Sequence, residues 1–425
     1  MTSIMGAAVP FKNESPAATT TAKKDESRTM LAVQWQGTRD VVTGEVPVPM
    51  LTDPKDVVVR ITASGLCGSD LHLYMGQLPG MKKGDIMGHE PMGIVEEVGP
   101  EVKKIKKGDR VVVASNISCG QCYYCKKELY IYCDTTNSGK EQDMIFGHHT
   151  AGLLGYSHLV GGYEGGQAEY LRVPFADVSC LVVPEDIPDE KAVTLGDLCC
   201  TSWHGCELGE VSEGDNVAVW GAGPIGIVAA HCAFVRGAAR VVLIDEQQSR
   251  LDFAKKKMPR LETINFREKN VITTLHDMFP ESRGPDVGIE CVGFHYAENL
   301  LQKIQMKLSL VSDTSEIVNE IMESVRKCGR VSVIGDYAGY CNQFNIGALM
   351  EKGLTLKSGM TSMQRYWPIL TKLIQEGKLD PSMPITHKLP LRDAPSAYKH
   401  FNDKDGGYIK IIFNPALDRQ TAQEQ

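Results

Sequence analysis

The segment NVAVWGAGPIGIVAAHCAFVRGAARVVLID, residues 216–245, decides the fold of this chain. A short apolar strand pattern leads into a glycine-rich turn and a helical run, and a second strand pattern then ends at Asp245. Gly221 allows the tight turn, Gly223 lets the backbone approach a pyrophosphate, and Gly226 allows close packing of helix on strand. A glycine motif alone is weak evidence, but this strand–turn–helix–strand context is typical of a dinucleotide-binding unit.

The two acidic residues at the end of the second strand indicate which dinucleotide would bind. Asp245 is placed to accept hydrogen bonds from the ribose hydroxyls of adenosine. Its charge and that of Glu246 would repel a 2′-phosphate. The start of the helix offers free N–H groups and a positive dipole end to the phosphates. The sequence therefore favours NAD over NADP.

Working outward from this segment, the chain divides into two kinds of pattern. Strands and helices alternate from residue 216 to VSVIG at residues 331–335, which indicates a parallel sheet covered by helices. Short strands separated by glycine-bearing turns come before it and indicate a β-rich, barrel-like domain. Those strands are expected at residues 30–35, 56–63, 93–98 and 109–114. After the alternating part, a helix is expected near residues 368–376 and a last strand at residues 408–413.

Composition excludes several classes of function. The chain has 425 residues, 42% of them hydrophobic, and a net charge of −8, so its field would not attract nucleic acid or anionic lipid. The basic run at residues 103–110 is short and fits a solvated turn. No apolar stretch approaches the roughly 20 residues of a membrane helix. We therefore expect neither a nucleic-acid partner nor a membrane.

The cysteines and the N-terminal composition bear on the compartment. Thirteen cysteines in a long chain with no secretory core favour a reducing environment, the cytoplasm by default, and make disulfides unexpected. Residues 1–29 are rich in Ser, Thr, Ala and Pro and include acidic residues, which is atypical of a transit peptide. We expect them to form a disordered arm.

Four of these cysteines lie within 15 residues in the pattern C-x2-C-x2-C-x7-C: Cys119, Cys122, Cys125 and Cys133. Four thiolates close a tetrahedral shell around one ion if the loop wraps around it, and Gly120 eases the first turn. Such a shell leaves no open position, so a zinc held there would be structural. An iron–sulfur cluster is the competing interpretation of the same thiolates, and unliganded core cysteines are a further one.

Two upstream segments predict a different kind of metal site. They read GLCGSDLH at residues 65–72 and GHE at residues 88–90. A thiolate from Cys67 and an imidazole from His89, with a third ligand from elsewhere, would leave the fourth zinc position open for water or a substrate oxygen. Each segment alone is weak evidence, because single Cys and His residues often lie in the core.

In combination, these motifs resemble those of the zinc-containing medium-chain alcohol dehydrogenase family. The resemblance covers about residues 30–415 and rests on GLCGSDLH, GHEPMGIVEEVG, the four-cysteine segment and GAGPIG. It implies a GroES-like β-rich catalytic domain with a Rossmann doubly wound parallel-sheet domain. The implied division is catalytic domain at 30–198 with both zinc sites, NAD-binding domain at 199–358, the second part of the catalytic domain at 359–415 and a tail at 416–425.

The resemblance also assigns roles around the open metal site. Cys67 and His89 match ligands of the catalytic zinc, and Glu90 matches a glutamate close to the metal. Asp70 matches a carboxylate that orients the ligand histidine and fixes its tautomer. Ser69 matches a hydroxyl that bonds the substrate oxygen. His72, at the end of the GLCGSDLH segment, matches the histidine that passes the proton outward through the cofactor ribose.

The third ligand departs from the common pattern of the family, which has a cysteine four residues before a nicotinamide-contacting threonine. Here Asp197 stands four residues before Thr201, while Cys199 and Cys200 are out of register. This arrangement resembles the glutathione-independent formaldehyde dehydrogenase branch, whose zinc takes Cys, His and Asp. GGQAEY at residues 165–170 and Val292-Gly293-Phe294 resemble that branch as well. We therefore expect Asp197 to be the third ligand.

The remaining cofactor contacts are carried over from the family. Ile225 would lie behind the nicotinamide and Thr201 beside it, Arg250 near the ribose, and Lys410 near the pyrophosphate. Gly68 replaces a basic phosphate contact of some relatives, which would leave more of pyrophosphate binding to Lys410 and the helix.

Together these features predict a dehydrogenase with two zinc ions per subunit that transfers hydride from an alcohol or aldehyde hydrate to NAD. The expected partner is that small molecule, and the expected assembly is a homodimer or homotetramer. Aldehyde dismutation with tightly bound NAD is an alternative, and residues 298–323 lie where an insertion helps to bury the cofactor in formaldehyde dehydrogenase relatives. A non-enzymatic zinc- and NAD-binding protein is the other alternative; the retained Ser69 and His72 weigh against it.

Overall fold

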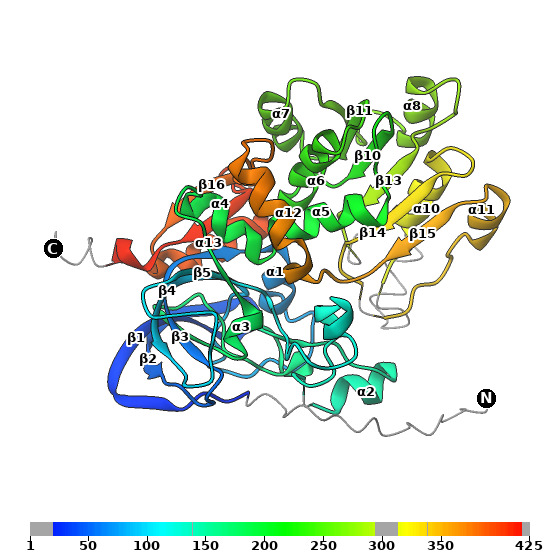
Figure 1. The fold of residues 1–425 in the computed structure, drawn as a ribbon. Helices are drawn as coiled ribbons and strands as arrows, with labels where there is room; N and C mark the ends of the chain where they lie inside the picture. Colours follow the sequence, from blue (N-terminus) through cyan, green and yellow to red (C-terminus); the bar gives the residue numbers. More distant parts are fainter. Residues whose placement is uncertain (1–19, 138, 294–312, 338, 419–425) are drawn as a thin grey trace.

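The computed structural model describes residues 20–137, 139–293, 313–337 and 339–418, which form two lobes (Figure 1). The green and yellow middle of the chain makes one lobe, built on a parallel sheet. The blue and cyan first part makes the other, and the red last part of the chain returns beside it. Among the described residues, no helix is both long and apolar enough to cross a bilayer.

The parallel sheet has six strands in the order β12-β11-β10-β13-β14-β15. This is the doubly wound order, in which the chain winds outward from a central strand in both directions, and it confirms the expected Rossmann fold. The strands are β10 (Asn216–Trp220), β11 (Arg240–Asp245), β12 (Glu262–Asn265), β13 (Val287–Glu290), β14 (Arg330–Val333) and β15 (Thr355–Ser358).

Helices cover both faces of this sheet, because successive side chains of a strand point to opposite faces and here both sets are apolar. In β10, Val217 and Val219 belong to the core on one face, whereas Ala218 and Trp220 belong to the core on the other. The first core packs under α5 (Leu198–Leu208), α6 (Pro224–Val235), α7 (Gln248–Lys257) and α12 (Met363–Gln375). The second packs under α8 (Val271–Met278), α10 (Glu316–Ser324) and α11 (Ile346–Glu351).

The other lobe is β-rich, as expected. Its main sheet runs in the order β16-β17-β3-β4-β5-β9, and β8 pairs with β3 beside that path. Its strands are β3 (Val57–Leu66), β4 (Glu90–Val98), β5 (Arg110–Val113), β8 (Tyr170–Val173), β9 (Cys180–Val182), β16 (Ile385–Leu389) and β17 (Lys410–Phe413). Because β17 pairs with β3, the end of the chain completes the sheet that its beginning started.

Short elements fill the rest of this lobe. The strands β6 (Asn116–Ile117) and β7 (Gly152–Leu153) pair with each other. The helices are α1 (Gly68–Tyr74), α2 (Glu141–Phe146), α3 (Ala176–Ser179), α4 (Asp189–Ala192) and α13 (Ala394–Asp403).

The prediction that residues 1–29 form a disordered arm is wrong for residues 24–29. β1 (Lys24–Gly37) already begins at Lys24 and pairs antiparallel with β2 (Asp40–Pro49). An ammonium–carboxylate pair between Lys24 and Glu164, 2.6 Å from Nζ to Oε2, joins this end of the strand to the body of the lobe. Composition does not predict this start of the strand, because one face of a hairpin can stay polar and exposed. Residues 1–19 of the arm lie outside the described residues.

Candidate active site

The start of helix α1 sets the first half of the site. Cys67 is the N-cap residue, and its backbone N–H donates a hydrogen bond of 3.0 Å to the Oδ2 atom of Asp70. This turn places the sulfur of Cys67 and the hydroxyl of Ser69 side by side, with Oγ 3.3 Å from Sγ. The same hydroxyl is 3.3 Å from Nε2 of His89. Three predicted site residues therefore meet at one helix end.

His89 precedes strand β4 and is fixed in orientation from its far side. Its Nδ1 lies 3.0 Å from Oδ1 of Asp70, whose side chain is fully buried. Nε2 therefore faces Cys67, Ser69 and Asp197, and lies 3.2 Å from Oδ2 of Asp197. Burial disfavours the imidazolium, but the carboxylates of Asp70 and Asp197 outweigh this and raise the pKa of His89 well above its ordinary value.

Asp197 comes from the start of helix α5, on the other side of the site. The Oγ1 of Thr201, one turn on, donates a 2.5 Å hydrogen bond to Oδ1 of Asp197 and leaves Oδ2 toward His89. Cys199 and Cys200 are both fully buried, and the thiol of Cys200 donates to a backbone carbonyl, that of Leu195. Neither cysteine joins the group around His89.

One ligand atom from each of Cys67, His89, Glu90 and Asp197 lies within 4.8 Å of the others. Sulfur, imidazole nitrogen and carboxylate oxygen are the donors that zinc takes, and three of them leave a fourth position open in a catalytic site. The residues present therefore fit a zinc ion. The orientation of His89 by Asp70 is the usual support for a metal-bound histidine.

Glu90, the fourth member of this group, is paired with a buried cation. Its carboxylate oxygens lie 2.5 and 2.7 Å from Nζ of Lys410, and both side chains are 1% exposed. Gly65 makes room for it, since a Cβ there would lie 1.9 Å from Oε2. Burial opposes the charge of Lys410, but Glu90 keeps its pKa raised. The pyrophosphate role expected of Lys410 stays a prediction, now with Glu90 as its partner in the free protein.

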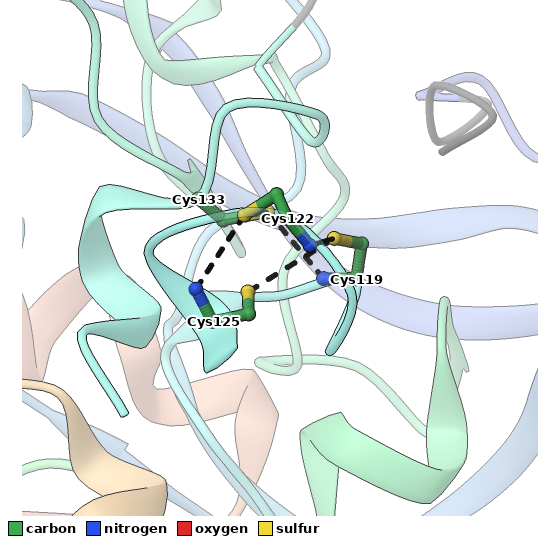
Figure 2. A group of neighbouring side chains, drawn as sticks. All are labelled: Cys119, Cys122, Cys125 and Cys133. Atoms are coloured by element: carbon green, nitrogen blue, oxygen red, sulfur yellow. Dashed lines mark hydrogen bonds between the residues drawn. The ribbon is translucent and has the colours of Figure 1, made fainter. Parts of the chain in front are cut away.

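The four-cysteine segment closes on itself (Figure 2). The sulfurs of Cys119 and Cys125 are 4.0 Å apart, and those of Cys122 and Cys133 are 3.9 Å apart. Tetrahedral zinc with Zn–S bonds of about 2.3 Å would separate its sulfurs by about 3.8 Å. All four side chains are buried, and Gly120 takes a positive φ of 75° at the first turn. The geometry fits one enclosed ion better than a multi-iron cluster, whose several irons would separate the sulfurs further.

A cleft of about 1260 Å³ runs between the two lobes and joins the open metal group to the glycine motif. The predicted residues that line it are Cys67, Ser69, His72, His89, Asp197, Thr201, Gly221, Gly223, Ile225, Asp245, Arg250 and Lys410. Gly226 lies behind the cleft, where a Cβ would be 1.8 Å from the carbonyl oxygen of Gly221. That contact is the close packing for which a glycine was expected.

At the β11 end of the cleft, Asp245 is oriented by the backbone. Its Oδ2 accepts a 2.6 Å hydrogen bond from the N–H of Ala222, within the glycine turn, and Oδ1 accepts one of 2.8 Å from Gln247. Glu246 pairs with Arg267, at 2.7 Å, and with Lys404, at 3.7 Å. The charge of Glu246 is thus partly neutralised, and Asp245 itself lies within electrostatic reach of Arg250.

Two residues at the site, Tyr156 and Asp336, had no signal in the sequence, and Gln167 entered only as part of the GGQAEY segment at residues 165–170. The ring edge of Tyr156 packs on His89, with centroids 5.8 Å apart, and its hydroxyl donates to the carbonyl oxygen of Ser69 at 3.4 Å. Gln167 donates to Asp70 at 3.4 Å. Asp336, just after β14, lines the cleft; desolvation raises its pKa, and the nearby charge of His72 opposes that rise. Only their positions in the fold connect them with the metal group.

Comparison with known proteins agrees with this geometry. Residues 53–185 match the model of the alcohol dehydrogenase GroES-like domain, and residues 224–312 match that of the zinc-binding dehydrogenases. The chain is 40% identical over 413 residues to a zinc-type alcohol dehydrogenase-like protein of Schizosaccharomyces pombe, covering 96% of this chain and 97% of the relative. The solved structure of the alcohol dehydrogenase TADH from Thermus sp. ATN1 is 33% identical, with a TM-score of 0.76, covering 91% of this chain and 99% of that one.

More distant relatives include proteins named for formaldehyde. Formaldehyde dismutase of Pseudomonas putida is 29% identical, and glutathione-independent formaldehyde dehydrogenase of Pseudomonas aeruginosa is 28% identical. Each match covers 90% of this chain and 97% of the relative. They support the resemblance to that branch, and the first comparisons show the family. This chain belongs to the zinc-type alcohol dehydrogenases, with a GroES-like domain and a Rossmann domain.

Proposed function

We propose that this protein is a zinc-dependent dehydrogenase that oxidises an alcohol or an aldehyde hydrate with NAD. The observation that carries the proposal is the convergence of Cys67, His89 and Asp197 on one point of the cleft that also contains the glycine motif. A three-donor metal group beside a dinucleotide cleft suits hydride transfer, because the substrate carbon and the cofactor can then be held in contact.

In this proposal Cys67, His89 and Asp197 hold the catalytic zinc, and Asp70 keeps Nε2 of His89 directed at it. Zinc bound there would supply Lewis acidity toward the substrate oxygen. Ser69, whose hydroxyl lies 3.3 Å from two ligand atoms, is placed to accept the proton of that oxygen. His72 lines the cleft and carries the proton to solvent, for which an imidazole is suited near neutral pH.

The cofactor proposal rests on the β11 end of the cleft. Asp245 is fixed by two backbone N–H groups at the end of β11, where an adenosine ribose lies in dinucleotide-binding folds of this kind. Thr201, Ile225 and Arg250 line the same cleft and remain the proposed contacts of the nicotinamide and ribose. Nicotinamide bound there would accept the hydride.

The second zinc is proposed for Cys119, Cys122, Cys125 and Cys133, with a structural role. We further propose a homodimer or homotetramer in a reducing compartment such as the cytoplasm. The thirteen cysteines are all free thiols, which suits that compartment.

A second candidate, aldehyde dismutation, follows from the similarity to formaldehyde dismutase of Pseudomonas putida. In it, one aldehyde is oxidised and another is reduced by the same bound cofactor. The segment expected to help bury the cofactor is residues 298–323. Of its residues, Glu316 and Ile317 of α10 line the cleft. Residues 298–312 lie outside the described residues, as does Phe294 of the branch-like Val292-Gly293-Phe294.

One experiment separates these functions. The zinc-loaded protein is incubated with formaldehyde, primary alcohols or polyols, with and without glutathione, and NADH, acid and alcohol products are measured. The dehydrogenase proposal predicts NADH formed in proportion to the oxidised product. Equal amounts of acid and alcohol without free NADH would favour dismutation. No turnover of any substrate with either NAD or NADP would favour a non-enzymatic zinc- and nucleotide-binding protein.

A further inference from the structure

A buried carboxylate with no assigned role lies under the floor of the cleft. Glu290 is the last residue of β13 and is fully buried. It accepts three backbone hydrogen bonds: Oε1 from the N–H groups of Val292 and Gly293, both at 2.7 Å, and Oε2 from that of Gly335, at 2.9 Å. Among the residues that the structure describes, no cation pairs with it.

These donors come from two different loops. Val292 and Gly293 follow β13, whereas Gly335 follows the neighbouring strand β14. One carboxylate therefore joins the loops at the carboxyl ends of adjacent parallel strands, next to the central strand β10. In a doubly wound sheet, ligands bind in the crevice outside these strand ends.

Both loops are shaped around this carboxylate. A Cβ at Gly335 would lie 2.2 Å from Oε2 of Glu290 and 2.5 Å from the backbone nitrogen of Gly293. Gly293 itself has a φ of +88°, a conformation that favours glycine. Two of the three positions that contact the carboxylate thus need glycine, Gly335 for space and Gly293 for conformation, which is a sign of a closely fitted arrangement.

The joined loops face the metal end of the cleft. Val292, Gly335 and Asp336 line it, and Asp336 lies within electrostatic reach of His72 and of the proposed ligands His89 and Asp197. The ribose-binding carboxylate of Asp245 belongs to β11, on the opposite side of β10. The floor that Glu290 fixes is therefore the half of the cleft that remains for the nicotinamide.

We infer that Glu290 is a positioning residue that fixes the β13 and β14 loops as the binding surface for the nicotinamide half of the cofactor. The inference rests on the proposed function, which supplies the dinucleotide. An ionised glutamate side chain is normally hydrated, and burial removes that water. Here three backbone N–H donors replace the water and hold the carboxylate in one orientation.

The test compares the binding of NADH with that of ADP-ribose, which lacks the nicotinamide, to the zinc-loaded protein by calorimetry. In Glu290→Gln an amide NH₂ replaces one carboxylate oxygen and must face a backbone N–H, so one loop is released. We expect the Kd of NADH to rise by about tenfold or more, as for a lost hydrogen bond to a charged group. The Kd of ADP-ribose should change by less than about twofold, within the range of a minor surface effect.

Two further variants make the result decisive. Gly335→Ala disturbs the same contact from the other loop and should give the same selective loss, even if Glu290→Gln does not fold. Asp286→Asn alters a carboxylate at the opposite end of β13, where it pairs with Arg326 and accepts from Asn216, and should affect both ligands equally. Equal losses of NADH and ADP-ribose binding in the Glu290 and Gly335 variants, or no loss, would overturn the inference. Wild-type protein that binds neither NADH nor NADPH would instead contradict the proposed function.

Discussion

The Nδ1 atom of His89 lies 3.0 Å from a carboxylate oxygen of Asp70, and the other oxygen of that carboxylate accepts from the backbone N–H of Cys67. One buried side chain thus orients two of the proposed zinc ligands. Asp70→Asn keeps the shape but removes the charge and replaces one accepting oxygen by an NH₂ group, so either His89 or the backbone N–H of Cys67 loses its acceptor. We expect zinc affinity at this site to fall by about 10- to 100-fold.

Competition with a chromophoric chelator measures that affinity. Asp177→Asn is a suitable control, because Asp177 also accepts backbone hydrogen bonds, from Lys103 and Lys104, but belongs to neither metal group. If the Asp70 and Asp177 variants hold zinc as tightly as wild type, Asp70 has no part in the metal site.

The third ligand can be tested by substitution at three neighbouring positions. Asp197→Asn should lose catalytic zinc or abolish turnover, because a neutral amide oxygen is a weaker ligand than a carboxylate. Cys199→Ala and Cys200→Ala should keep both, since these thiols are fully buried and neither belongs to the metal group. Zinc content and initial rates are measured for each. A cysteine variant that loses the metal while Asp197→Asn keeps it would show that a cysteine is the ligand.

The four-cysteine group should hold a second zinc with a different consequence for stability. Cys122→Ser should remove one zinc per subunit and lower the melting temperature, because closed thiolate sites contribute about 10–16 kcal/mol of apparent binding energy in small zinc domains. Cys67→Ser should remove the other zinc with little change in melting. Cys328→Ser, at an exposed cysteine outside both groups, is the control. Elemental analysis of well-folded wild-type protein showing one zinc or none would contradict this assignment.

The preference for NAD should depend on Asp245. Asp245→Ala removes an acceptor for the ribose hydroxyls, worth about 1.5–3 kcal/mol, so NAD affinity should fall by about 10- to 100-fold. It also removes a charge that repels a 2′-phosphate, so the ratio of kcat/KM for NAD to that for NADP should fall. Glu246 remains beside it, held by Arg267 and Lys404, and should prevent a full reversal. Steady-state kinetics with both cofactors decide this: a wild-type preference for NADP, or an unchanged ratio, removes Asp245 from the site.

The features that could be predicted from sequence are those whose chemistry is local. GAGPIG between two strand patterns predicts the turn, the helix and the sheet. Each of its glycines is required by a turn or a close contact that lies within ten residues of it in the sequence. The cysteine spacing of residues 119–133 predicts a closed group of sulfurs for the same reason. Asp197 is located only through the family resemblance, in which the third ligand stands four residues before a threonine, and the structure does bring its carboxylate to His89.

Contacts between distant parts of the chain could not be predicted in this way. Glu90 and Lys410 are 320 residues apart and meet only because β17 returns to pair with β3. Tyr156 packs on His89 from a loop whose sequence has no periodicity. The start of β1 was missed because its residues are polar and exposed, and only its pairing with β2 shows that Lys24 lies in a strand. Tertiary pairing supplies this information, and local propensity does not.

We expect hydride to pass from a substrate carbon to nicotinamide at the Cys67–His89–Asp197 site. The most direct measurement is transfer of deuterium from carbon-deuterated alcohols and deuterated formaldehyde to NAD, detected by mass spectrometry of the cofactor. Zinc-loaded wild-type protein should label the cofactor with at least one of these substrates, and folded Cys67→Ser, which retains the four-cysteine zinc, should label it with none. Absence of label from every substrate in wild type, or equal labelling by Cys67→Ser, would contradict the account.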